Sequence, residues 1–289
     1  MDISFLQTLL SVERYGSIAA AARVQGLTSA AVSQRIKTLE EQLKTPLFKR
    51  SGKTVKPSEG CLRILPAVRK IVEEVSALPS LVSADGLNCT LRIGAIGTMM
   101  SGLIPQSLAK LRVAAPGVLP EIHPGTSPAL YEALMKGELD MALLIAPPFD
   151  LPKHLKATHI RREKLNLLSS LEDKGDFETL FRSRPYIQYN PQSWGGRQAE
   201  KFLHDQGIMP DIFCMIDALS TTANMVAQGL GISLVPDWLR DSDDSYDVRW
   251  TVIEDDIYAR DIILLQQHMS AKSSAIEAFK TAAGISGKL

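Results

Sequence analysis

The stretch that decides the fold of this chain is Gly16–Arg50, GSIAAAARVQGLTSAAVSQRIKTLEEQLKTPLFKR. Gly26 divides it into an alanine-rich segment, which Ser17 can cap, and a second segment with helical periodicity, which Thr28 can cap. The apolar residues of the second segment recur at helical spacing and are Val32, Ile36, Leu39 and Leu43. The stretch therefore predicts two helices joined by a short glycine-containing turn, the first with small side chains that let another helix pack closely.

The opposite face of the second predicted helix is polar. It offers short hydroxyls and one amide to base edges, and cations to phosphates. Such a helix, preceded by a helix and a tight turn, is the arrangement that enters the DNA major groove. The predicted DNA-binding residues are Thr28, Ser29, Ala30, Ser33, Gln34, Arg35, Lys37, Arg50 and Lys53.

The charge distribution supports a polyanionic partner for this part of the chain. The whole chain is neutral, with 32 basic and 32 acidic residues, but residues 1–85 contain 12 Lys and Arg against 8 Asp and Glu. Residues 35–56 contain seven of these basic residues and only two acidic ones, Glu40 and Glu41. A basic segment of this kind releases counterions when it neutralises phosphates. Charge alone also fits an ordinary solvated surface, so the helical pattern decides between the two.

The same residues carry a family resemblance. The Leu27-Thr28 opening, Ala31-Val32-Ser33, the Ile36/Leu39/Glu40 triplet and the closing Leu47-Phe48-x-Arg50 resemble the winged helix-turn-helix of LysR-type transcriptional regulators. The sequence departs from that pattern at Ser29, where the family often has Gln, at Lys44, where Gly is common, and in Lys53–Gly60, KTVKPSEG. The resemblance implies a transcription regulator that binds double-stranded promoter DNA and is not an enzyme.

A predicted linker helix follows the wing. Apolar residues from Cys61 to Val75 recur at alternating spacings of four and three, as in the seam of a two-stranded coiled coil, and Pro79 marks the expected end. An amphipathic helix buried on its own domain would give the same pattern. Helix-turn-helix geometry favours a dimer on a two-fold related site, and the resemblance implies pairing of linker helices and a tetramer. The predicted dimerisation residues are Leu65, Val68, Val72 and Val75.

From about residue 86 the pattern changes to alternating strands and helices, which predicts α/β lobes with a mainly parallel sheet. Expected strands are Thr90–Ile96, Val118–His123, Met141–Ile145, Tyr186–Tyr189, Ile212–Ile216, Ile232–Val235 and Ile262–Gln266, and expected helices Ser101–Ala114, Ser127–Lys136, Ser193–Asp205, Ser220–Gln228 and Ser273–Ala283. This half resembles the family's effector domain, which is built like a periplasmic binding protein, most clearly at Gly137–Asp140 and Gly229–Pro236.

The expected fold is therefore a helical winged helix-turn-helix with a long linker helix, followed by a two-lobed, periplasmic-binding-protein-like α/β domain. The corresponding divisions are a DNA-binding domain at 1–58, a linker at 59–85 and an effector domain at 86–289, with lobe one at about 86–163 and 268–289 and lobe two at about 164–267.

Ligands of such a domain bind in the crevice between the lobes, where strand ends and helix N-termini favour anions. The hydroxyl residues there could instead cap their own helices, and Arg197 could be a surface residue rather than a partner for a carboxylate beside the Trp194 indole. The predicted effector-binding residues are Gly97, Thr98, Met99, Thr126, Ser127, Asn190, Ser193, Trp194, Arg197, Leu219 and Ser220. We expect effector binding to change the lobe angle and thereby the spacing of paired recognition helices.

Other functions find little support in the sequence. The five histidines show no metal spacing, and Gly229-x-Gly231 lies between a helix and a strand, the reverse of a dinucleotide site, so no metal or cofactor is expected. No apolar run is long enough for a membrane helix and the N-terminus has no signal pattern, which predicts a cytoplasmic protein. A small-molecule binding protein whose N-terminal domain contacts protein is the alternative, and salt-dependent DNA retention would separate the two.

Overall fold

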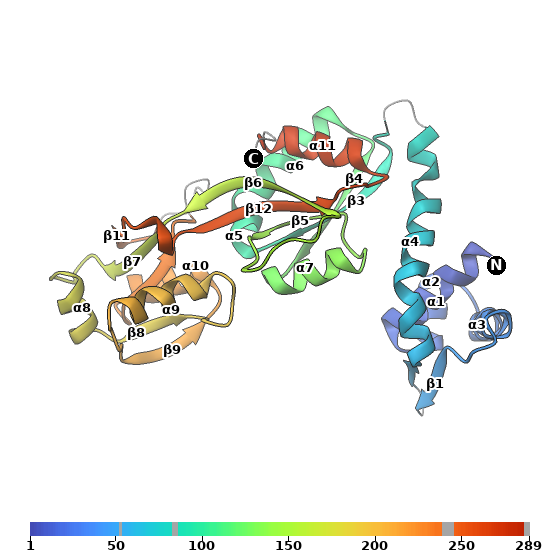
Figure 1. Cartoon of the computed structure of the whole chain (residues 1–289), viewed down its shortest axis with the longest axis horizontal. Helices are drawn as coiled ribbons and strands as arrows, with labels where there is room; N and C mark the ends of the chain where they lie inside the picture. Colours follow the sequence, from blue (N-terminus) through green and yellow to red (C-terminus); the bar gives the residue numbers. More distant parts are fainter. Residues whose placement is uncertain (52–53, 83–85, 239–245, 286–289) are drawn as a thin grey trace. The chain divides into compact units, whose positions relative to one another are not determined.

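A computed structural model describes residues 1–51, 54–82, 86–238 and 246–285 of the chain. They form two units, Met1–Ala84 with Lys136–Glu138, and Asp85–Met135 with Leu139–Leu289 (Figure 1). The first unit is mainly helical, and the second contains two α/β lobes.

Three short helices build the core of the N-terminal unit: α1 (Ile3–Tyr15), α2 (Ile18–Gln25) and α3 (Ser29–Leu43). Ser17 and Thr28 cap α2 and α3 as predicted, since their side-chain oxygens accept hydrogen bonds from the backbone N–H groups of Ala20 and Ala31. Val32, Ile36 and Leu39 are buried against α1 and α2, whose core residues include Leu9 and Ala21. The helix-turn-helix prediction is confirmed.

The wing is a two-stranded antiparallel hairpin, β1 (Phe48–Ser51) and β2 (Thr54–Pro57), in which Lys49 is the register partner of Lys56. Glu40 of α3 fixes the beginning of the hairpin, because its Oε1 accepts hydrogen bonds from the backbone N–H of Leu47 at 2.6 Å and of Phe48 at 3.3 Å. Where the structure describes this unit, its secondary structure is helical except for one hairpin.

The linker helix α4 (Glu59–Val82) starts inside the core of the N-terminal unit. Leu65 and Val68 are each 5% exposed and pack with the core of α1–α3, and Val72 is partly buried against the same cluster. The expected seam is thus wrong for Leu65 and Val68, because their own domain already covers them. Among the side chains of α4 that the structure describes, Ile71, Val75 and Leu78 are the large apolar ones exposed towards its C-terminal end.

Lobe one is a five-stranded mixed sheet in the order β4-β3-β5-β12-β6. The first three strands are parallel and the last two antiparallel to their neighbours. Helices α6 (Leu103–Ala114) and α11 (Ser273–Ala282) cover one face of the sheet and α7 (Ser127–Met135) the other, while the short α5 (Gly97–Ser101) precedes α6 (Figure 1). The strands are β4 (Val118–Pro124), β3 (Cys89–Ala95), β5 (Met141–Ile145), β12 (Arg260–Gln267) and β6 (Leu155–Glu163).

Lobe two contains a three-stranded antiparallel sheet, β10-β7-β11, and a parallel pair, β8-β9. Its core is rich in aromatic side chains, with Tyr186 and Trp238 among the most buried. The strands are β7 (Leu165–Ser170), β8 (Tyr186–Tyr189), β9 (Ile212–Ile216), β10 (Ser233–Pro236) and β11 (Val248–Val252), and the helices α8 (Phe177–Ser183), α9 (Gly196–Asp205), α10 (Leu219–Ala227) and the 3-10 turn η2 (Asp256–Tyr258).

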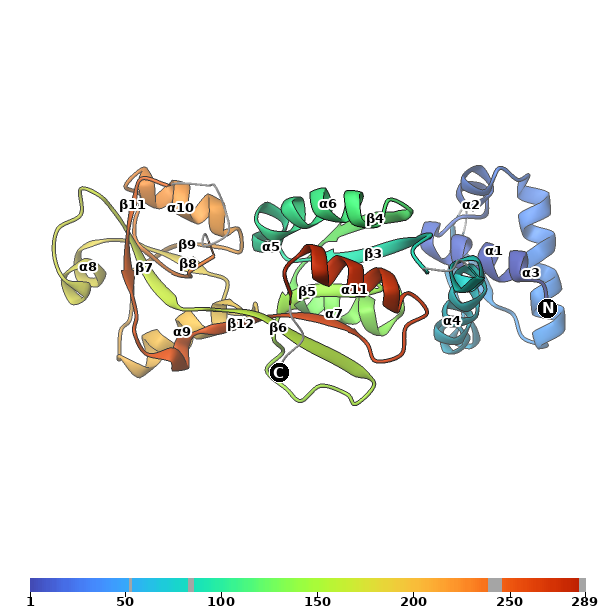
Figure 2. The same cartoon turned by 90° about the horizontal axis from the view of Figure 1, so that it is seen from above.

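The chain passes between the lobes where β6 continues into β7 and where η2 leads into β12 (Figure 2). Arg260 and Glu163, at the lobe-two ends of β12 and β6, are register partners. Two predictions are corrected here. The strand at 260–267 belongs to the lobe-one sheet rather than to lobe two. The sheets are also not mainly parallel: the lobe-one sheet is mixed and the three-stranded sheet of lobe two is antiparallel, because the strands that join the lobes run antiparallel to their partners.

Candidate functional site

The N-terminal end of α3 presents the exposed polar surface that the sequence predicts for a recognition helix. Thr28, Ser29, Ala30 and Gln34 are exposed, and Ser33 is half-buried beside them. Lys37 is exposed and lies 3.8 Å from Glu41, an exposed pair that contributes little to stability. These side chains are therefore free to contact base edges and phosphates.

Arg35 differs from its neighbours because its guanidinium group is engaged inside the unit. Nη1 donates to the Oγ1 of the buried Thr8 at 3.1 Å, and the guanidinium carbon lies 5.7 Å from the centre of the Phe5 ring. Both partners belong to α1, so Arg35 ties α3 to α1. Arg35 therefore has a structural role within the unit, and its contact with DNA stays a prediction.

The wing adds a pair of lysines that the list of predicted contacts omitted. Lys49 and Lys56 face each other in register on the hairpin, and both are exposed. Arg50 lies on the same strand, paired with Val55, while Lys53 lies outside the described residues. The basic run at residues 35–56 was the signal that could have pointed to the Lys49/Lys56 pair.

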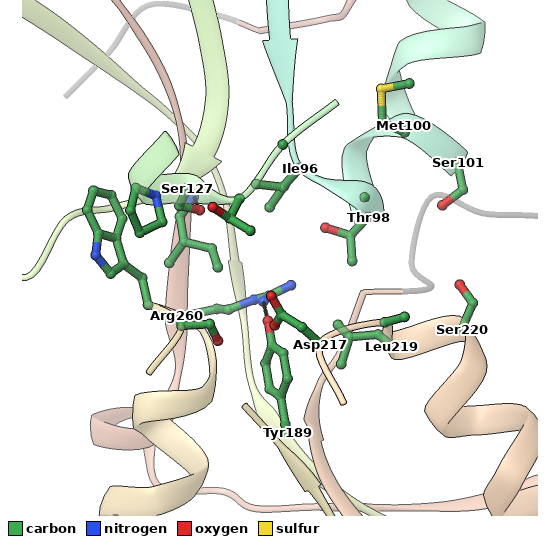
Figure 3. A pocket seen from close by; sticks show the side chains of 18 residues that line it. Ile96, Thr98, Met100, Ser101, Ser127, Tyr189, Asp217, Leu219, Ser220 and Arg260 are labelled. Carbon is green, nitrogen blue, oxygen red and sulfur yellow. Dashed lines mark hydrogen bonds between the residues drawn. The ribbon is translucent and has the colours of Figure 1, made fainter. Parts of the chain in front are cut away.

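A cavity of about 530 Å³ lies between the two lobes of the effector unit, at the ends of β3, β5 and β8 (Figure 3). Most of the predicted effector residues line it, which brings together segments far apart in the sequence. They are Gly97, Thr98, Thr126, Ser127, Ser193, Trp194, Leu219 and Ser220. Sequence reasoning missed other lining residues, chiefly Ile96, Met100, Ile145, Tyr189, Asp217 and Arg260.

Three predicted residues do not line the cavity. Met99 is fully buried in the lobe-one core, because it lies on the inner side of α5. Asn190 is used locally, since Oδ1 accepts from the Gln192 N–H and its carbonyl accepts from the Ser193 hydroxyl. Arg197 is exposed in the first turn of α9 and is not among the residues that line the cavity.

The hydroxyl groups at the cavity differ in their hydrogen-bond partners. Ser193 bonds its own turn, donating to Asn190 O and accepting from Gly196 N, as the capping alternative proposed. Ser127 instead accepts from Ile145 N at 3.1 Å and so ties α7 to the end of β5. Thr98 Oγ1 is inaccessible to solvent and has no hydrogen-bond partner among the described residues. Thr98 thus has a buried hydroxyl with unused hydrogen-bonding capacity.

Trp194 is committed mainly to packing between the lobes. Its ring centre lies 5.7 Å from that of Phe149 and 6.1 Å from that of Tyr131, and the residue is 9% exposed within the lobe-one core cluster. Tyr131 belongs to lobe one, whereas Trp194 comes from the loop after β8 of lobe two. The indole therefore joins the lobes beside the cavity and leaves little surface for stacking on a ligand.

Arg260 is the buried cation of the site. It is 3% exposed; Nε donates to Glu163 Oε2 at 2.6 Å and Nη1 to the Tyr189 hydroxyl at 3.2 Å, whereas Nη2 has no partner among the described residues. Burial opposes its charged form, but the Glu163 carboxylate and the bonds to Glu163 and Tyr189 raise the pKa of Arg260 above its ordinary value. Arg260 therefore carries a positive charge at the cavity wall.

Two carboxylates lie near Arg260. Glu163 is buried and is shared with Arg161, whose Nε donates to Oε1 at 2.8 Å. Asp217, between β9 and α10, faces the cavity, and burial raises the pKa of its carboxyl above the ordinary value, against the Ser193 hydroxyl and the Arg260 charge. The site thus pairs a buried guanidinium with a carboxyl that burial makes harder to ionise than a solvent-exposed one.

Comparison with known proteins identifies both parts of the chain. Residues 3–61 match the family described as "Bacterial regulatory helix-turn-helix protein, lysR family", and residues 84–284 match the "LysR substrate binding domain". The chain belongs to the LysR family. The HTH-type transcriptional regulator CzcR of Bacillus subtilis (strain 168) is 30% identical over 245 residues, covering 82% of this chain and 81% of CzcR.

Further LysR-type regulators are similar at lower identity. BenM of Acinetobacter baylyi is 26% identical over 250 residues, covering 82% of this chain and 80% of BenM. Two solved structures share the fold. A full-length OxyR variant from Pseudomonas aeruginosa has a TM-score of 0.73 and 20% identity, and the match covers 98% of this chain and 94% of that one. Full-length CbnR complexed with its target DNA has a TM-score of 0.64 and 17% identity, and the match covers 98% of this chain and 100% of CbnR.

This LysR-type protein is a sequence-specific DNA-binding transcription regulator whose promoter binding a small-molecule effector modulates, and its relatives are regulators rather than enzymes. LysR-type regulators act as oligomers on promoter DNA. In the part of the chain that the structure describes, no helix could cross a membrane and no group of three His, Cys, Asp or Glu residues could hold a metal ion.

Proposed function

We propose that this LysR-type regulator reads its promoter with the N-terminal end of α3 and binds its effector in the cavity between the lobes. Residues 1–58 would bind DNA, residues 59–85 would pair subunits, and residues 86–289 would bind the effector. The observation that carries the DNA-binding role is the exposed polar surface formed by Ser29, Ala30, Ser33 and Gln34 on a capped, buried helix.

Within this surface the side chains have separate tasks. Ser33 and Gln34 can bond base edges and would set the preference among sites, because their groups can both donate and accept hydrogen bonds. Lys37, Arg50, Lys53 and the wing pair Lys49/Lys56 would contact phosphates, which adds affinity without sequence preference. Arg35 supports the recognition helix through Thr8 and Phe5.

The effector we propose is a small anion. The cavity has the size of small-molecule sites, and it combines apolar walls at Ile96 and Leu219 with a few polar groups that converge on one space. The buried Arg260 guanidinium provides the positive charge, and Thr98 and Ser220 provide hydroxyls. The effector would bring the lobes to a different angle and thereby change the spacing of the paired recognition helices.

Pairing of subunits would use the C-terminal half of α4. Ile71, Val75 and Leu78 are exposed there, at 45%, 41% and 54%, and share one side of the helix. We propose a dimer through this stripe on a promoter site with two-fold symmetry, and a tetramer built from two kinds of dimer. The protein would act in the cytoplasm, where bacterial promoter DNA is found.

The test is binding of the purified full-length protein to DNA flanking its own gene, measured across a salt series with Gln34→Ala and Lys56→Ala variants. Gln34→Ala should change the ranking of sites that differ by one base pair, by about 1–3 kcal/mol at the position it reads. Lys56→Ala should weaken binding to all sites and reduce the salt slope by about one. Equal effects of both variants on every sequence would contradict these roles.

A further inference from the structure

We propose that the effector is a small monocarboxylate that carries a hydrogen-bond donor, such as a hydroxy or amino acid, with its carboxylate on Arg260 Nη2 and Thr98 Oγ1 and its donor on Asp217. The inference rests on the proposed function, because it names the ligand of the same cavity. Arg260, Thr98 and Asp217 come from β12, α5 and the β9–α10 loop, and their side chains point towards one space (Figure 3).

The first observation is a pair of unused polar atoms. Arg260 Nη2 and Thr98 Oγ1 are both inaccessible to solvent and without a hydrogen-bond partner among the described residues, although both residues line the cavity. Buried donors are almost always satisfied in folded proteins, and an unsatisfied one is costly. A carboxylate has the acceptor oxygens that both groups lack, and it gains charge assistance from the guanidinium.

The other arms of Arg260 are fixed, so Nη2 is held in place before a ligand arrives. Nε donates to Glu163, at the end of β6, and Nη1 donates to Tyr189, at the end of β8 in lobe two. A side chain at position 195 would disturb this arrangement, because a Cβ on Gly195 would lie 2.7 Å from Nη1 and 2.5 Å from the Tyr189 hydroxyl. The pocket is therefore built around this guanidinium.

The N-terminus of α10 adds favourable dipoles for an anion. Its N-cap residue, Ala218, has no side chain that could accept from the first N–H groups, and Leu219 and Ser220 line the cavity. Helix N-termini with free N–H groups stabilise negative charge. This feature supports the carboxylate position that Arg260 and Thr98 define.

Asp217 determines the rest of the ligand's chemistry. Among the described lining residues, Arg260 is the one cation and Asp217 the one carboxyl. A second negative charge on the ligand would meet Asp217 without another cation to balance it, which disfavours dicarboxylates and phosphate esters. A hydroxyl or ammonium group would instead donate to the Asp217 carboxylate and stabilise its ionised form.

The ligand would also act at the hinge. Arg260 begins β12 next to the end of β6, so both crossings between the lobes meet at this side chain. Thr98 belongs to lobe one and Asp217 to lobe two. A ligand that bonds all three groups would favour the lobe angle at which they are within reach together, which gives it a differential affinity for two states.

The experiment measures binding to the full-length protein by thermal shift and by tryptophan fluorescence, without DNA. The probes are lactate and mandelate, each compared with its primary amide, with the deoxy acid (propionate or phenylacetate) and with the dianion malate. The hydroxy acids should raise the Tm at about 10 mM, and the amides and malate should bind about tenfold more weakly or worse. No shift with either hydroxy acid, or equal shifts with the amides, would overturn the proposal.

Three variants and one control variant localise the effect. Thr98→Val keeps the shape of the side chain and should weaken binding of the hydroxy acids about tenfold. Arg260→Lys keeps the positive charge but lacks Nη2, so it should reduce the preference for acid over amide. Arg197→Gln, at an exposed arginine of lobe two, should change nothing. Asp217→Asn should bring the ratio of hydroxy acid to deoxy acid affinity towards one. Unchanged ratios in Asp217→Asn and Arg260→Lys, in folded protein, would contradict the assignment.

Failure of this inference is distinguishable from failure of the proposed function. A neutral or dianionic ligand could bind in the cavity and alter the affinity for DNA. That result would support the regulator function and contradict the proposal that the effector is a monocarboxylate. Binding of a hydroxy acid with the predicted variant effects but no influence on DNA would support the ligand chemistry and contradict its role as effector.

Discussion

Lys44, which ends α3, has a backbone φ of +51° and is the one non-glycine residue with positive φ among those the structure describes. This conformation costs L-residues other than glycine about 1–2 kcal/mol of conformational free energy, and glycine adopts it without that cost. Its N–H bonds the carbonyls of Glu40 and Glu41, so the turn is needed to close the helix. The sequence therefore keeps a strained residue at a position where glycine would be free of strain.

Lys44→Gly should raise the stability of the N-terminal unit by about 0.5–1 kcal/mol, since the relief of strain exceeds the extra entropy that glycine gives the unfolded chain. Thermal unfolding measures it. Lys44→Ala is the matched control, because it removes the same charge and retains the strain. A glycine variant no more stable than the alanine variant would show that the lysine is not strained.

Arg35 and Lys37 separate structural from DNA-contact roles on one helix. Arg35→Ala should lower the stability by about 1 kcal/mol, because the buried Thr8 loses its charged donor. Lys37→Ala should leave the stability within about 0.5 kcal/mol and reduce the salt slope of DNA binding by about one. Thermal unfolding and salt titrations of DNA affinity test both; the reverse pattern would assign DNA contact to Arg35 and structure to Lys37.

Interactions between residues close together in the sequence could be predicted from the sequence, whereas interactions between distant residues could not. The caps at Ser17 and Thr28 depend on partners three residues away, and the periodicity of α3 depends on neighbours in the same helix, so both could be inferred. Arg260 is separated from Glu163 by 97 residues and from Tyr189 by 71, and no local pattern marks it. The central cation of the cavity therefore became visible only in the folded chain.

At the scale of elements, the apolar residues of α4 form two surfaces, one packed in the core of the N-terminal unit and one exposed. Cys61, Leu65 and Val68 complete the core of the N-terminal unit, while Ile71 and Val75 are exposed on an adjacent stripe. Heptad spacing alone does not distinguish a seam between subunits from a face that packs on its own domain. The earlier half of the expected seam was wrong for this reason.

Ile71→Asp should weaken the association of subunits, because it places a charge in the exposed stripe of α4 that we assign to the interface. Leu62→Asp is the control: Leu62 is 56% exposed on the same helix, half a turn around from Ile71. Sedimentation velocity across a concentration series should show a larger rise in the dimer dissociation constant for Ile71→Asp than for Leu62→Asp. Equal effects would remove this stripe from the interface.

At the scale of the whole molecule, the effector unit is organised by the two crossings between its lobes. The sequence pattern predicted most strands and helices of this unit. The predicted lobe boundary at 267 was wrong, because the apolar residues of β12 fit a buried strand of either lobe equally well. Only pairing with β5 and β6 assigns it to lobe one. The arginine that starts β12 thereby lies between the lobes, where a ligand can influence both.

The central claim is that one protein couples promoter reading by α3 to occupancy of the cavity. The most direct measurement is a DNase footprint of the full-length regulator on the DNA flanking its own gene, with and without a ligand whose binding the thermal shift establishes. We predict protection of a site with two-fold symmetry, and a change in its extent or in the DNA bend when the ligand is bound. A ligand that shifts the Tm but leaves footprint, bend and affinity unaltered would contradict the coupling.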